Sequence, residues 1–180
     1  FDFQNIGKSA ARFDLKKLQF LSGQHIKNAD DACLLNQIID FYSKDNKSII
    51  SKEKVKLLKT SLYCLKDRAK TFAELIEKAQ FILAETPIQM SSDAVINLDK
   101  SGLKMLETLT PQLHNVNWVR EDLEHVCNSV AESCGVKFGK LASPMRAALS
   151  GRTKTPSVFD MMLVLGRDIT ILRFNNAQGI

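Results

Sequence analysis

Cationic side chains gather in residues 144–166 of this sequence, where they could bind an anion. Arg146, Arg152 and Lys154 lie within or beside a short segment between two predicted helices. Backbone N–H groups at a helix N-terminus carry partial positive charge, and cationic neighbours add to it. Such a site suits phosphate groups, so we predict that residues 144–166 contact a nucleic acid.

Proline and glycine predict the boundaries of the helices in this stretch. A serine or threonine before a proline is a typical helix start, and a glycine is a typical helix end. Start and end signals alternate twice, which predicts two short helices joined by a tight basic elbow, with both N-termini close together in the sequence. The signals in chain order are Ser143-Pro144, Gly151, Thr155-Pro156 and Gly166.

A second group of cations lies on the helix predicted to begin at Ser51. Apolar residues recur there every three or four positions, and lysines follow in a parallel row. Such a row is commonly a solvated face whose lysine stems cover apolar side chains, and the alternative is a row of phosphate contacts. The lysines are Lys52, Lys56, Lys59, Lys66 and Lys70.

Arg68 lies at a predicted corner between two helices. Thr71 and Glu74 follow it with the spacing of a capping box, which fixes the start of the next helix. An arginine at such a corner either binds carbonyl groups at the end of its own helix or is presented to a ligand. The residues alone leave both roles open.

Residue types that could catalyse a reaction or bind a metal lack the required spacing. The sequence has no glycine-rich phosphate loop and no G-x-S-x-G motif, and its three histidines are isolated. The cysteines form no C-x-x-C pair, so we predict no zinc site and expect free, buried thiols. They are Cys33, Cys64, Cys127 and Cys134. The segment is therefore predicted to recognise a partner and not to catalyse a reaction.

Helical spacing of apolar residues runs along most of the chain, without the alternation typical of β-strands. We predict an all-α fold of about nine or ten short helices in two stacked small bundles. A break near residues 86–93 places the bundles at 31–88 and 89–180, after a leading segment at 1–30. The predicted helices cover residues 14–28, 30–42, 51–68, 71–82, 98–113, 117–135, 144–151, 156–166 and 167–174.

The composition indicates a globular protein with a mild excess of positive charge. The 25 lysines and arginines exceed the 20 acidic residues by five, which favours an anionic partner. No apolar run is long enough to span a membrane, and we expect a cytoplasmic protein. The chain begins with Phe1 and not with methionine, so we expect a piece of a longer protein.

Several motifs follow one another along nearly the whole chain. They are residues 8–18 (KSAARFDLKKL), 71–75 (TFAEL), 135–140 (GVKFGK), 144–151 (PMRAALSG), 155–159 (TPSVF) and 165–166 (LG). In this order they resemble the C-terminal half of bacterial glutamate–tRNA ligases, the class I glutamyl-tRNA synthetases. The sequence departs from the family's usual residues at Phe20, Ser22 and Ser157.

The resemblance implies the C-terminal part of an enzyme that attaches glutamate to tRNA in two ATP-dependent steps. ATP and Mg would bind a catalytic domain outside this chain, because the family's HIGH and KMSKS motifs are missing here. This segment would hold no catalytic residue and no cofactor of its own. It would comprise the tail of a stem-contact region and an all-helical anticodon-binding cage, with tRNA-Glu as partner and a monomeric state.

The resemblance also implies residues that contact the anticodon. In this family an arginine before the Thr-x-x-Glu corner recognises the third anticodon base, and a guanidinium fork suits an unstacked cytosine. The implied anticodon contacts are Arg68, Arg146, Thr155, Pro156 and Val158. The candidate phosphate contacts are Arg152, Lys154 and Lys66. The alternatives are a free-standing helical protein- or RNA-interaction module, a non-catalytic paralogue, and an enzyme that also charges tRNA-Gln.

Overall fold

The computed structural model describes residues 14–46, 49–67, 69–85 and 87–179, and every regular element within them is a helix. The predicted all-α fold is confirmed. In chain order the elements are α1 (Leu15–Asn28), α2 (Asp31–Asn46), α3 (Lys52–Leu65), α4 (Phe72–Lys78), α5 (Gln80–Leu83), α6 (Ser92–Asn97), α7 (Lys100–Leu109), the 3₁₀ helix η2 (Thr110–His114), α8 (Arg120–Ser133), α9 (Phe138–Ser150) and α10 (Val158–Gln178).

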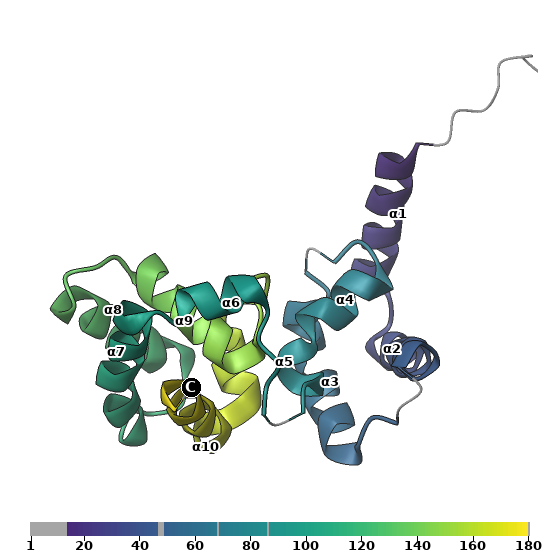
Figure 1. Ribbon diagram of the computed structural model, residues 1–180. Helices are drawn as coiled ribbons and strands as arrows, with labels where there is room; N and C mark the ends of the chain where they lie inside the picture. The colour runs from purple at the N-terminus through teal and green to yellow at the C-terminus, as the bar shows by residue number, and fades with distance from the viewer. Residues whose placement is uncertain (1–13, 47–48, 68, 86, 180) are drawn as a thin grey trace, which may run out of the picture.

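The helices form two groups, which Figure 1 shows side by side. Helices α2 to α5 make up the first bundle, and α1 extends from it away from the rest of the molecule. Helices α6 to α10 make up the second bundle, in which α9 packs against α6, α7, α8 and α10. The two bundles meet where α3 packs against α10 and where α5 packs against α9.

Side-chain caps set the starts of four helices in the first half of the chain, and Asp30, which accepts the N–H groups of Ala32 and Cys33 at 3.0 Å, caps one of them. Oxygens of Asp14, Ser51 and Thr71 each accept a backbone N–H from the first turn of the following helix, at 3.0 to 3.3 Å. The Glu74 carboxylate reaches back and accepts the N–H of Lys70, the residue before the cap, at 2.8 Å, so the reciprocal bond of the box goes to Lys70 and not to Thr71. The helix starts predicted at these three residues are confirmed.

Two predicted boundaries that precede α9 in the second bundle differ from the structure. The helix expected over residues 98–113 is α7 followed by the tighter η2, because Pro111 has no N–H to continue the α-helical pattern. Asn117 does not cap α8, which begins at Arg120. The Asn117 side chain instead donates to the Asp122 carboxylate at 2.8 Å.

The four cysteines are free thiols, and two of them are buried in the helical packing. Burial is confirmed for Cys64 and Cys127, whereas Cys134 is partly exposed and the prediction is wrong for Cys33, which lies exposed on α2. Burial raises the pKa of the Cys127 thiol to about 12. The folded state therefore favours the neutral form of this thiol.

Raising the pH is expected to weaken the folded state through Cys127. Because its pKa rises from 9.0 to about 12 on folding, its stabilisation is complete below the unfolded value and is lost as the pH rises toward the folded one. Urea midpoints followed by circular dichroism from about pH 8 to about pH 10.5 should fall more steeply for the wild type than for Cys127→Ala. Parallel curves for the two proteins would contradict this assignment.

Candidate nucleic-acid interface

The elbow, residues 151–157, joins the C-terminus of α9 to the N-terminus of α10. Gly151 adopts the left-handed conformation (φ 67°, ψ 13°) and donates its N–H to the Ala147 carbonyl at 2.8 Å. The helix end predicted at Gly151 is confirmed. The end predicted at Gly166 is confirmed as well, because its φ of 77° and ψ of 171° interrupt α10.

The helix start predicted at Ser143-Pro144 is wrong, because α9 already begins at Phe138. Pro144 lies inside α9, where its ring is buried and its fixed φ is compatible with the helix despite the missing N–H. The Ser143 hydroxyl donates to the Gly139 carbonyl at 3.2 Å and therefore caps nothing.

The second start, predicted at Thr155-Pro156, is displaced toward the C-terminus, because α10 begins at Val158. The elbow thus joins one helix C-terminus to one helix N-terminus, and the predicted pair of neighbouring N-termini is wrong. Any attraction for an anion at the elbow depends on a single helix start and on the side chains beside it.

A neighbouring backbone segment, residues 89–91, holds the elbow in place. The Ser91 N–H donates to the Gly151 carbonyl at 2.9 Å. The Arg152 guanidinium donates to the carbonyls of Gln89 at 3.1 Å and Gly151 at 3.0 Å. From residue types alone, residues 89–91 indicate only a break between the bundles, because backbone contacts leave no signal in side-chain patterns.

The predicted contact residues on the elbow differ in their access to a partner. Thr155 is partly exposed, and its hydroxyl donates to the Pro156 carbonyl at 2.9 Å. Pro156 and Val158 are buried, and the ring of Phe159 stacks on Phe138 with 5.2 Å between centroids. Contacts from Pro156 and Val158 in this conformation would come from backbone atoms, and their role stays a prediction.

Among the described residues, no carboxylate pairs with Arg146. It lies near the C-terminal end of α9, where burial alone lowers the pKa of its guanidinium. Arg120 binds carboxylates, and Arg152, Arg167 and Arg173 bind backbone carbonyls. Of the arginines that the structure describes, Arg146 alone has no acceptor for its guanidinium among the described residues. Its five donors have no acceptor within the described part of the chain and are available to bind an incoming partner.

The other predicted cations lie in different surroundings. Lys154 is exposed on the elbow, beside Arg152. Lys66 belongs to the first bundle, and its ammonium group donates to the Ala29 carbonyl at 2.7 Å and to the Asp31 carboxylate at 2.9 Å. These bonds give Lys66 a structural role, and its phosphate contact stays a prediction. Arg68 lies outside the described residues.

The described part of the chain offers a partner cationic and hydrogen-bonding groups at the elbow. Within the same residues, no cluster of three or more histidine, cysteine or acidic side chains has the arrangement of a metal site. None of the helices that the structure describes combines the length and apolar character needed to cross a membrane.

The sequence is similar to longer curated proteins over almost its whole length. It is 52% identical to glutamate–tRNA ligase 2 of Ruegeria pomeroyi and 49% identical to glutamate–tRNA ligase 2 of Roseobacter denitrificans, each over 98% of this chain. The chain spans 38% of the length of each relative. The resemblance drawn from the motifs is confirmed by these matches.

Solved structures with the same fold carry related names. A glutamate–tRNA ligase from Elizabethkingia meningosepticum, crystallised with its amino acid, matches 99% of this chain with a TM-score of 0.75 and 23% identity. The glutamate–tRNA synthetase of Elizabethkingia anophelis matches 100% of it with a TM-score of 0.72 and 25% identity. This chain covers 35% and 34% of those two proteins. The family model described as 'Anticodon binding domain' matches residues 32–178 of this sequence. The chain therefore belongs to the anticodon binding domain family.

Proposed function

We propose that this chain is the anticodon-binding part of a glutamate–tRNA ligase and that it binds the anticodon loop of tRNA-Glu. The observation that carries the proposal is Arg146, a partly buried guanidinium without an acceptor among the described residues. Partial burial costs a cation part of its hydration, and an anionic or carbonyl partner can compensate for that loss. A phosphate or the edge of an unstacked base would supply the missing acceptors.

The whole protein would attach glutamate to tRNA-Glu in two ATP-dependent steps. ATP and Mg would bind the catalytic part, which lies outside this chain, as the 38% coverage of the relatives suggests. Residues 1–30 would end the stem-contact region, and residues 31–88 and 89–180 would form the two anticodon-binding subdomains. We further propose that the protein is cytoplasmic and acts as a monomer.

The candidate residues lie in both bundles, and their positions indicate which part of the anticodon loop each would contact. Arg146 and the elbow belong to the second bundle, and the Arg68 position follows α3 in the first. Bases recognised by these two groups would be splayed apart across the two bundles. Lys154 would add sequence-independent attraction to the phosphates.

Arg68→Ala in the full-length protein is expected to weaken tRNA-Glu binding by about 1–3 kcal/mol and to relax discrimination at one anticodon base. The physical reason is the loss of a guanidinium fork, whose fixed donors distinguish one base edge from another. Filter binding of tRNA-Glu and of variants with single anticodon replacements measures both effects. An equal loss for all these tRNAs would contradict a base-specific role.

Salt dependence separates this function from a protein-interaction module. Binding through phosphates releases counterions, so the affinity should fall steeply between two salt concentrations. Lys154→Ala is the matched variant, because it should reduce the salt slope by about one and leave anticodon discrimination unchanged. A wild-type protein with no salt-dependent RNA binding would support the interaction module instead.

A further inference from the structure

Two pockets that open to solvent lie along the contact between the two bundles. One cavity of about 670 Å³ lies between α3, α5, α9 and α10, lined by residues that include Leu57, Ile82 and Leu165. A second, of about 610 Å³, lies between α3 and α10, lined by residues that include Thr60 and Leu163. Close packing usually fixes how two helical units sit against each other. Where packing leaves such gaps, directional polar bonds have more influence on the orientation.

One carboxylate joins three helices at this contact. The same oxygen of Asp160, in the first turn of α10, accepts from the Tyr63 hydroxyl at 3.2 Å and from the Arg120 guanidinium. Tyr63 belongs to the last turns of α3, and Arg120 is the first residue of α8. Asp160 thus connects the first bundle with two helices of the second.

Both donors to Asp160 keep their protons at neutral pH. Tyr63 is 57% exposed, yet its partial burial and the nearby Asp160 carboxylate raise its pKa to about 12, so its hydroxyl remains a donor at neutral pH. Burial acts to lower the pKa of Arg120, but Asp160 and Glu124 outweigh it and raise that pKa. The Asp160 side chain is 14% exposed, whereas that of Glu124 is 44% exposed. Asp160 is therefore the shielded partner and Glu124 the solvated one.

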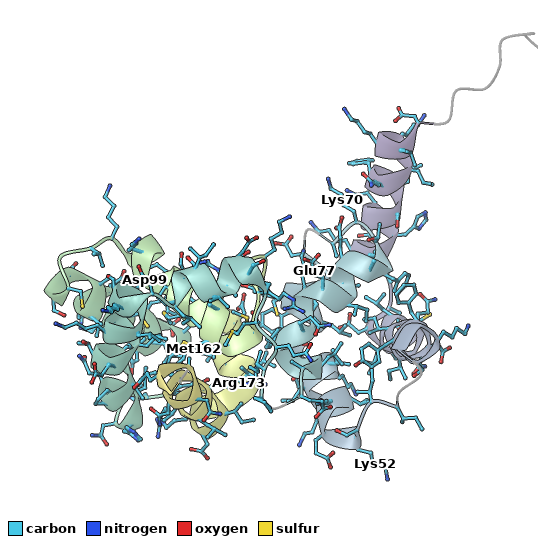
Figure 2. All side chains as sticks on the ribbon, viewed as in Figure 1. Lys52, Lys70, Glu77, Asp99, Met162 and Arg173 are labelled. Carbon is cyan, nitrogen blue, oxygen red and sulfur yellow. The ribbon has the colours of Figure 1, made fainter. Side chains whose placement is uncertain are left out.

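The second tie between the bundles also comes from α10. Figure 2 shows Arg173 of α10 at the boundary between the bundles, and its guanidinium donates to the carbonyls of Phe81 in α5 and Leu149 in α9. Arg173 holds the C-terminal half of α10. Asp160 holds its first turn, which directly follows the elbow.

We propose that Asp160 is a positioning residue of the anticodon interface, which holds the elbow in place relative to α3 through Tyr63 and Arg120. This inference rests on the proposed function. The elbow and Arg146 lie in the second bundle, and α3 leads toward the Arg68 position. Two groups of residues that bind one RNA loop at the same time gain affinity only when the distance between the groups matches the loop. Asp160 sets that spacing.

Asp160→Asn and Tyr63→Phe in the full-length protein test the inference. Each removes one side of the junction with little change in volume, and neither residue is placed in contact with tRNA. Both variants should raise the KM for tRNA-Glu about tenfold and leave kcat unchanged at saturating tRNA. The losses of tRNA-binding free energy caused by Arg68→Ala and by Arg146→Met are also compared with the loss caused by both together. In the Asp160→Asn or Tyr63→Phe background, the sum of the single losses should lie closer to the combined loss than it does in the wild type.

Glu124→Gln is the matched control, because Glu124 binds the same arginine but touches neither α3 nor α10 through a hydrogen bond. Wild-type KM in Asp160→Asn and Tyr63→Phe, or an equal rise in Glu124→Gln, would overturn the inference. If Asp160→Asn does not fold, Tyr63→Phe decides alone. A wild-type protein that does not discriminate among anticodons would remove the proposed function, and the positioning role with it.

Discussion

Gly151→Ala is expected to destabilise the second bundle by about 2–5 kcal/mol. Gly151 has a φ of 67°, a conformation that costs any residue with a Cβ about 1–2 kcal/mol. A Cβ there would also lie 2.4 Å from the Gln89 carbonyl oxygen and 2.8 Å from a side-chain carbon of Ile88. The first of these contacts is with backbone, which cannot rotate out of the way.

The substitution should act first on the contact between the elbow and residues 89–91. Moving Gln89 would break the Arg152 bond to its carbonyl and the neighbouring Ser91 bond to Gly151. Hydrogen exchange of the amides at the end of α9 and the start of α10 measures this local loss, because it resolves the stability of individual segments. Faster exchange should appear there before it spreads to the first bundle.

Gly139→Ala is the matched control on the same helix. A Cβ on Gly139 would meet nothing within 4 Å, and the residue lies in the first turn of α9. Alanine should therefore be neutral or stabilise the helix by about 0.5–1 kcal/mol through its lower entropy cost. Equal protection of the amides in Gly151→Ala and Gly139→Ala would contradict the steric argument.

The sequence was most informative where a local interaction decides the structure. Asp14, Ser51 and Thr71 each cap a helix with their own side chain, so residue type and spacing were enough to place those starts. Glycines at helix ends were equally informative, because tolerance of a positive φ is a property of glycine itself. Helical periodicity was sufficient for the all-α fold class in the same way.

Pro144 shows where local reasoning fails. A serine followed by a proline is a good helix start in isolation, yet α9 runs through both residues. The helix is buried along most of its length by α6, α7, α8 and α10, and this packing compensates for one missing hydrogen bond. Such compensation depends on residues distant in sequence, so the motif alone could not reveal it.

In the candidate site, too, residue types were predictable from the sequence, whereas contacts between distant residues were not. The cationic character of residues 144–166 was apparent from residue types alone. The difference between Arg146 without an acceptor and Arg152 bound to carbonyls depends on where residues 89–91 lie, which no local pattern predicts. The Asp160 junction joins positions from three helices, and nothing in the sequence marked Tyr63, Arg120 and Asp160 as partners.

Arg146→Met is expected to weaken tRNA-Glu binding by about 1–3 kcal/mol while leaving the folded state as stable as before or more stable. Methionine has a similar unbranched shape and a good helix propensity, so α9 should be preserved. No hydrogen bond between described residues is lost, because the Arg146 guanidinium has no acceptor among them. A partly buried charge without an acceptor among the described residues is removed, which relieves the free chain of a partial desolvation cost that the RNA would otherwise compensate.

A substitution that weakens tRNA binding without lowering the free energy of unfolding identifies an arginine that binds the ligand and does not support the fold. Arg152→Met is the comparison variant. Its guanidinium donates to Gln89 and Gly151, so its loss should lower stability as well as binding. Arg146→Lys separates charge from geometry, because lysine keeps the charge without the planar fork and should recover only part of the affinity. Thermal unfolding of the chain and tRNA titrations of the full-length protein provide the two measurements. A loss of stability in Arg146→Met that matches its loss of binding would show that Arg146 supports the fold and not the RNA.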